Sequence, residues 1–164
     1  MSRLLDQRRG LLRAALGVAA LAAAPRSGLA AAPAVQTFEP ASLAAITAAH
    51  RGQAFWLVLW DLECTYCMQS LQFLAAVQRR NPGLKVVTIA TDGIDKGEAI
   101  AARLGKIGIR GPAYAFGPDQ PEAALRHAID PAWRGEKPRA YQYRADGSRR
   151  AVVGVLTQKE LTQP

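Results

Sequence analysis

The feature that most constrains this chain is Cys64-Thr65-Tyr66-Cys67, because it contains the only two cysteines among 164 residues. A continuous apolar run, residues 54–60, comes before the motif and is typical of a buried β-strand. After the motif, apolar residues recur every three or four positions over residues 68–78, the spacing of a helix with one buried face. The sequence therefore predicts that Cys64 lies where a buried strand turns into the N-terminus of a helix.

That position has chemical consequences for the two thiols. Helix-start amides without intrahelical partners, together with the helix dipole, favour negative charge and so stabilise a thiolate at Cys64. The thiolate is the nucleophilic form of cysteine, and the spacing lets Cys67 reach back to close a short disulfide ring. We therefore expect a redox-active dithiol in which Cys64 attacks and Cys67 resolves. A purely structural disulfide and a copper(I) site that also uses Met68 remain alternatives.

The first part of the sequence has the composition of an export signal. Arginines precede and flank an apolar stretch, residues 11–24, and small residues follow at 28–32. This pattern predicts a cleavable signal over residues 1–31, of the general secretory or the twin-arginine type. A retained N-terminal membrane anchor is a third alternative. Each of the three places the folded part outside the cytoplasm, in the bacterial periplasm, where disulfides persist.

The net charge and the positions of the histidines limit which partners and metals we expect. The formal net charge is +8, but the first 31 residues hold five arginines and one aspartate, which leaves about +4 on the remainder. No basic run interleaved with aromatic residues occurs there, so we expect no nucleic-acid partner. A zinc site would need two further ligands, and neither a second CxxC motif nor paired histidines occur, since His50 and His127 are isolated. We expect no metal and no organic cofactor.

The remaining sequence indicates one domain, residues 38–164, after a linker at 32–37. Its order of elements, a βαβ unit followed by a ββα unit, predicts an α/β fold with a mixed central sheet flanked by helices. We expect helices over residues 39–50, 65–80, 95–104, 121–129 and 158–162, with Gly105 as the cap of the third. We expect strands over residues 54–60, 84–90, 113–116, 139–144 and 149–155, with a turn at 91–93 after the second strand.

This arrangement resembles the thioredoxin superfamily, and within it the exported, TlpA-like thiol–disulfide oxidoreductases. The matching residues are Trp60, four positions before the first cysteine, then Cys64 and Cys67, and later Lys137-Pro138, which is followed by the predicted hairpin. The resemblance implies a thioredoxin-like fold and a cis proline at Pro138 that faces the cysteine pair. It also implies that the residue before this proline offers backbone hydrogen bonds to an extended partner.

The resemblance implies an activity and its partners as well. It favours a reductase of disulfide-bearing periplasmic proteins, such as an apocytochrome c or a copper-site assembly factor, with electrons supplied by a membrane thiol donor. A copper(I)-handling metallochaperone and a non-catalytic interaction module are the alternatives. The first would bind copper(I) through its cysteines, and the second would keep them as a structural disulfide.

Several residues near the motif depart from the thioredoxin pattern. Glu63 occupies a position that is usually Trp, and the family's buried acid would fall at Val58, which cannot take a proton. Asp61 or Glu63 could replace that acid as a proton acceptor for the resolving cysteine. We expect Glu63 to oppose a thiolate at Cys64 and Lys137, from across the site, to support it.

The aromatic residues beside the motif are expected to shape the site. Trp60 and Tyr66 would form an apolar cover over the sulfur atoms and guide an unfolded partner. Ordinary packing is the alternative, and for Trp60 the two roles are not exclusive. Thr65 completes the spacer between the cysteines. The polar segment 133–137 is expected to border the site.

Overall fold

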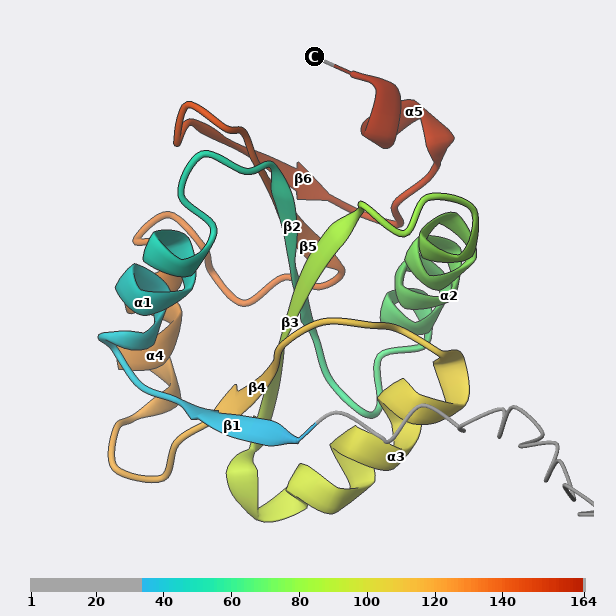
Figure 1. Ribbon diagram of the computed structural model, residues 1–164. Coiled ribbons are helices and arrows are strands. Elements are labelled where there is room, and N and C mark those ends of the chain that lie inside the picture. Colours follow the sequence, from blue (N-terminus) through green and yellow to red (C-terminus); the bar gives the residue numbers. More distant parts are fainter. Residues whose placement is uncertain (1–33, 164) are drawn as a thin grey trace, which may run out of the picture.

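The apolar run at residues 55–60 forms β2 (Phe55–Trp60), an interior strand of the sheet in the computed structural model, which describes residues 34–163. All six of its residues are buried, because helices cover both faces of the sheet (Figure 1). β2 pairs in parallel with β3 and antiparallel with β5, so the sheet is mixed. The order across the sheet is β1 (Val35–Phe38), β4 (Ala113–Phe116), β3 (Lys85–Gly93), β2, β5 (Arg139–Tyr143) and β6 (Arg149–Val153).

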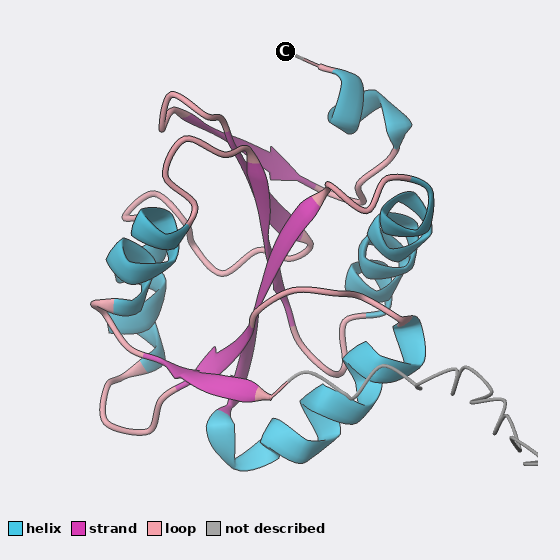
Figure 2. Ribbon diagram, viewed as in Figure 1, coloured by secondary structure: helices cyan, strands magenta, loops and turns pink. Residues whose placement is uncertain are grey.

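Figure 2 shows helices on both sides of the sheet, and two hydrophobic clusters hold them there. On one face, α2 (Thr65–Arg80) and α3 (Gly97–Ile107) pack through side chains such as Leu71 and Leu104. On the other face, α1 (Ser42–Ala49) and α4 (Glu122–Ile129) pack through side chains that include Ile46, Leu125 and Ile129. The last helix, α5 (Gln158–Thr162), adds Leu161 to the cluster that contains α2.

The structure corrects several expected boundaries. The first helix begins at Ser42 and not at residue 39, and the last strand ends at Val153 and not at residue 155. Residues 35–37, which we expected in a linker, belong to β1 and pair with β4. The expected turn at 91–93 is instead the end of β3, where pairing shifts after Ala90 and resumes between Gly93 and Phe116. The third helix continues past Gly105 to Ile107, because Gly108, with φ of 79°, is the residue that takes the left-handed conformation of a helix C-cap.

The mixed α/β architecture agrees with the expected fold, including the parallel β2-α2-β3 unit and the terminal hairpin with its closing helix. The predicted export signal at residues 1–31 lies outside the described residues. Within residues 34–163, none of the helices has the length and apolar character that a membrane crossing requires.

Candidate active site

Cys64 occupies the N-cap position of α2, and its sulfur is bonded to that of Cys67. The Cys64 Sγ also accepts a hydrogen bond from the backbone N–H of Cys67 at 3.2 Å. A side-chain acceptor at this position satisfies one of the free amides that every helix start presents. The local sequence therefore places the first sulfur where the backbone favours negative charge, as the motif predicted.

The two cysteines differ sharply in exposure. Cys67 is completely buried, at 0% exposure, and belongs to the same hydrophobic cluster as Trp60 and Leu71. Cys64 is half-buried and lies at the edge of that cluster. An approaching molecule can therefore reach the sulfur of Cys64 while that of Cys67 stays beneath it.

The segment between β2 and α2 is tied down by two aspartates. Asp61 accepts a hydrogen bond from the backbone N–H of Glu63 through Oδ1, at 3.0 Å. Asp92 accepts one from the backbone N–H of Leu62 through Oδ2, at 2.8 Å. Asp92 reaches this segment because β3 continues to Gly93 instead of turning away. The extra residues of β3 thus help to fix the approach to the dithiol.

The Lys137–Pro138 segment lies at the same end of the sheet as the dithiol. β5 starts opposite the end of β2, and Arg139 pairs with Leu59. The Lys137–Pro138 peptide bond is cis, the form that the resemblance implies. Pro138 is buried, and its carbonyl accepts a hydrogen bond from the backbone N–H of Gly154 at 2.9 Å.

Lys137 links the segment before β5 to Asp61, which follows β2, and to Thr91 in β3. Its ammonium forms an ion pair with Asp61 and donates a hydrogen bond to Thr91 Oγ1 at 2.8 Å. We expected this cation to act on Cys64, but the carboxylate of Asp61 balances its charge. The Asp61 carboxylate is therefore engaged by Lys137 and by the Glu63 N–H. It joins the segment after β2 to the segment before β5, and it is not a free proton acceptor.

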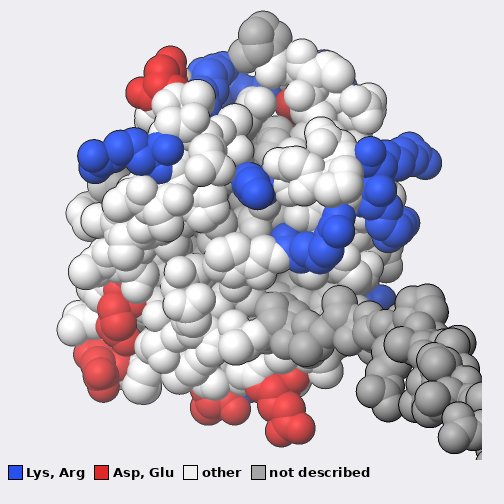
Figure 3. Space-filling view, viewed as in Figure 1, with Lys and Arg blue, Asp and Glu red and all other residues white. Residues whose placement is uncertain are grey.

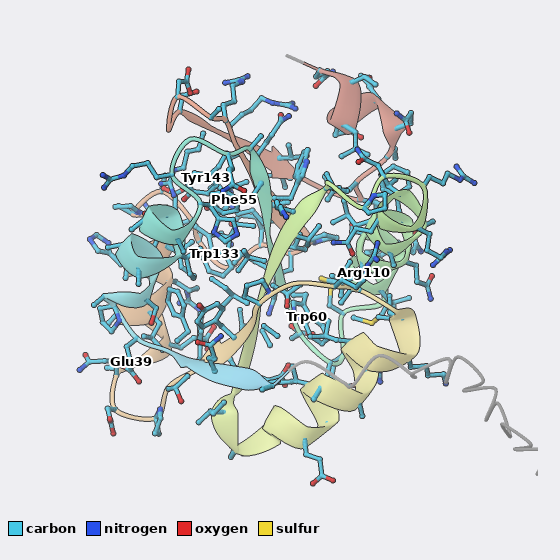
Figure 4. The ribbon with its side chains drawn as sticks, in the orientation of Figure 1. Glu39, Phe55, Trp60, Arg110, Trp133 and Tyr143 are labelled. Carbon is cyan, nitrogen blue, oxygen red and sulfur yellow. A yellow bond between two sulfur atoms is a disulfide. The ribbon has the colours of Figure 1, made fainter. Side chains whose placement is uncertain are left out.

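The remaining predicted site residues fall into two groups. Glu63, Thr65 and Tyr66 are exposed beside the disulfide, and Tyr66, at 62% exposure, offers an apolar surface there. Trp60 is completely buried beneath the site on the α2 side of the sheet, whereas Trp133 lies on the opposite side (Figure 4). Trp60 therefore packs in the core in the same cluster as Cys67, which is compatible with an apolar cover beneath the site, but it presents no exposed surface to a partner.

A buried polar network, which no sequence pattern predicted, holds the segment before Pro138. Arg139 donates to Asp130 Oδ2 at 2.9 Å and to the Tyr141 hydroxyl at 2.6 Å, and that hydroxyl donates to Asp130 Oδ2 at 2.8 Å. Arg139 also pairs with Glu136. Asp130 directly follows α4 and Arg139 begins β5, so their ion pair clamps both ends of the segment that carries Lys137 and Pro138.

The network changes the pKa of the Tyr141 phenol and of the Asp130 carboxyl. Burial and the hydrogen bond to Asp130 raise the pKa of Tyr141 well above its ordinary value. Burial also acts to raise the pKa of Asp130, but hydrogen bonds from the Ala132 backbone, Tyr141 and Arg139 outweigh it. The net pKa of the Asp130 carboxyl therefore lies below its ordinary value. The carboxylate stays ionised and the phenol neutral, which keeps every hydrogen bond of the clamp in place.

Met68, which we considered as a copper ligand, faces a cation instead. A guanidinium nitrogen of Arg103 lies 3.4 Å from Met68 Sδ and 3.4 Å from the carbonyl oxygen of Leu62. A fixed positive charge beside the thioether works against binding of a metal cation there. Within residues 34–163, no group of three or more His, Cys, Asp or Glu side chains is arranged to hold a metal.

Together, these features define a thioredoxin-like fold with an asymmetric cysteine pair at the start of its second helix. Neither a protein-family model nor a curated protein matches the sequence. Solved structures do match it. One is a secreted disulfide oxidoreductase of Mycobacterium tuberculosis, described as homologous to E. coli DsbE. It matches with a TM-score of 0.54 and 22% sequence identity, and the match covers 70% of this chain and 81% of the M. tuberculosis chain.

Two further structures give the same result. A thioredoxin-family thiol:disulfide interchange protein from Chlorobium tepidum has a TM-score of 0.54 and 20% identity, over 70% of this chain and 79% of its own. A DsbF homologue from Corynebacterium diphtheriae has a TM-score of 0.53 and 21% identity, over 70% of this chain and 71% of its own. The similarity confirms the thioredoxin-like fold that the sequence resemblance implied.

Proposed function

We propose that this chain is an exported thiol–disulfide oxidoreductase that reduces disulfides of periplasmic proteins. The observation that carries the proposal is the unequal exposure of the two cysteines, with Cys64 half-buried at a helix N-terminus and Cys67 completely buried. A partner sulfur can reach only Cys64, so attack and resolution are assigned to different cysteines. A disulfide with a merely structural role would not need this arrangement.

The reaction begins from the reduced dithiol. The Cys64 thiolate attacks one sulfur of the partner disulfide, forms a mixed disulfide with it, and releases the other sulfur as a thiolate. The Cys67 thiolate then attacks Cys64 Sγ, closes the Cys64–Cys67 disulfide and releases the second partner sulfur. Two electrons pass from the dithiol to the partner, whose thiolates take up protons from water. The hydrogen bond from the Cys67 N–H favours the negative charge on Cys64 Sγ in the first step.

The surroundings of the dithiol suit a polypeptide partner. Tyr66 offers an exposed apolar surface beside the disulfide, and the clamped segment before Pro138 supplies a rigid second wall. We propose that the backbone at Lys137 hydrogen-bonds an extended strand of the partner. Candidate partners are an apocytochrome c or a copper-site assembly factor, and a membrane thiol protein would return the electrons.

Export through a signal at residues 1–31 completes the proposal. A secreted disulfide oxidoreductase is among the structurally similar proteins, which is consistent with a chain that works outside the cytoplasm. N-terminal sequencing of the protein recovered from the periplasm tests this part directly. A new N-terminus after Ala30 or Ala31 is expected, and an intact Met1 would contradict cleavage and favour a retained anchor.

The central test compares Cys67→Ser, Cys64→Ser and the unchanged chain on a peptide disulfide. Reduced Cys67→Ser is expected to accumulate a mixed disulfide with the peptide, visible as a mass adduct that dithiothreitol removes. Cys64→Ser should form little adduct, because its remaining sulfur is buried. Equal trapping by both variants would refute the assigned roles.

The direction of electron flow is tested by equilibrating the pair with glutathione. A potential near −270 mV, about that of thioredoxin, supports a reductase, whereas one near about −120 mV reverses the direction. A pair that never exchanges with glutathione would leave a non-catalytic interaction module. Tight copper(I) binding that is lost in Cys67→Ser would favour a metallochaperone.

A further inference from the structure

We propose that a cationic groove beside the dithiol binds an acidic segment of the substrate protein, next to the cysteine that Cys64 attacks. The groove lies between α2 and α3 and has a volume of about 390 Å³. Its lining residues are Met68, Gln72, Arg103, Lys106 and Ile107, and we call it the α2–α3 groove. The inference rests on the proposed function and specifies the chemistry of its partner.

The position of the groove links it to the reactive sulfur. Cys64, Met68 and Gln72 follow one another at intervals of four residues, so they lie along one face of α2. Each interval advances about 6 Å along the helix axis. The groove therefore extends from about 6 to 12 Å beyond Cys64. An extended chain, at about 3.3 Å per residue, covers that distance in two to four residues.

The charge of the groove is positive and is not balanced by its own walls. Lys106 is exposed and Arg103 half-buried, and the lining contains no carboxylate. Arg103 is held in place by the Leu62 carbonyl and the Met68 sulfur, two neutral acceptors. Within the described part of the chain, neither cation lies within 4.0 Å of a carboxylate, whereas Lys137 and Arg139 do.

The chemistry of the partner follows from the lining of the groove. On the face shown in Figure 3, Lys and Arg side chains gather on the side where α2 lies, and acidic side chains lie along the lower edge, where α3 begins. Exposed carboxylates of a partner would gain charge-assisted hydrogen bonds from Arg103 and Lys106. The apolar parts of Met68 and Ile107 would contact the stem of the same side chains. An acidic segment two to four residues from the partner cysteine fits both requirements.

The test uses two peptides, each with one cysteine blocked as a neutral methyl disulfide. They differ only in carrying two Glu or two Gln residues at the third and fourth positions from the cysteine. Single-turnover reduction by the reduced protein is followed by acid quenching and mass spectrometry. At low salt, the Glu peptide is expected to react about three- to tenfold faster, and the preference should shrink as salt is added.

Lys106→Gln is the decisive variant, because Arg103 also holds the Leu62 carbonyl and is less safely changed. The preference for the Glu peptide should fall at least by half in Lys106→Gln and reverse towards the Gln peptide in Lys106→Glu. Lys85→Gln is the matched control, since Lys85 is an exposed cation at the start of β3, at the opposite end of the sheet from the dithiol. It should keep the full preference.

The outcomes separate the inference from the proposed function. If both peptides are reduced equally fast, or if Lys106→Gln keeps the preference, the groove is not the binding site, but the oxidoreductase proposal stands. If neither peptide is reduced, the proposed function itself fails. If Lys106→Gln keeps the peptide preference but loses binding to phosphatidylglycerol vesicles, the groove binds a membrane surface and the inference is overturned.

Discussion

Replacing Tyr141 with phenylalanine would remove one buried hydroxyl and leave the ring in place. That hydroxyl accepts a hydrogen bond from Arg139 and donates one to Asp130, at 2.6 and 2.8 Å. Hydrogen bonds to charged groups contribute about 1.5–3 kcal/mol each. Because Arg139 and Asp130 keep their direct contact at 2.9 Å, the losses should not add fully. We expect the free energy of unfolding to fall by about 2–3 kcal/mol.

Urea unfolding of the oxidised protein measures this loss. With a slope of about 1–3 kcal/mol per molar urea, the midpoint of Tyr141→Phe should fall by about 1–2 M while the slope stays the same. Tyr66→Phe is the matched control, because Tyr66 is 62% exposed and loses a hydroxyl at the surface instead of one in a buried network. Its midpoint should equal that of the unchanged protein.

The same variant tests whether the clamp positions the wall opposite the dithiol. Loosening the segment before Pro138 should raise KM for a peptide disulfide several-fold, while the reduction potential of the cysteine pair stays unchanged. An unfolding midpoint equal to that of the unchanged protein would refute the energetic reasoning. A reduced stability with unaltered KM would leave the clamp a purely structural role.

Three further changes test other parts of the site. Ser70→Ala leaves the buried N–H of Leu156 without its 3.0 Å acceptor, so the free energy of unfolding in urea should fall by about 1–3 kcal/mol. Asp130→Asn should be less stable than the unchanged protein at pH 7. The lowered pKa of Asp130 stabilises the fold above its unfolded pKa of about 3.9, so the deficit measured in urea should shrink as the pH falls below that value. Glu63→Gln should change the iodoacetamide alkylation rate of reduced Cys64 by less than about fivefold, because an exposed charge is screened.

The parts of the fold that could be predicted from sequence are those with a local signal. The apolar run of β2 and the helical spacing after Cys67 placed the dithiol correctly, because periodicity reports burial directly. The end of the third helix was misplaced because two glycines stand three residues apart, and only the backbone conformation distinguishes the cap, Gly108, from Gly105. The short edge strand β1 pairs with residues 78 positions further along the chain, and four residues carry too little pattern to predict it.

The polar contacts of the site could not be predicted for the same physical reason. Lys137 and Asp61 are 76 residues apart, and their pairing follows from the register of β5 against β2, which neither residue encodes alone. The sequence indicated that both charges lie near the dithiol, but not that they neutralise each other. The Asp130–Arg139 clamp had no sequence signal, because an aspartate after a helix and an arginine at the start of a strand are common on exposed surfaces.

These contacts change how charge near the dithiol should be understood. Lys137 is paired with Asp61, and Glu63 is exposed, so neither side chain presents an uncompensated charge buried against Cys64. The contact that does reach the Cys64 sulfur is a backbone N–H at the start of α2. Thiolate stabilisation should therefore come mainly from the helix start, a feature of the fold that side-chain substitutions leave intact. The charged residues around the motif then do not set the reactivity of Cys64, which is compatible with the partner-binding role proposed for Arg103 and Lys106 of the α2–α3 groove.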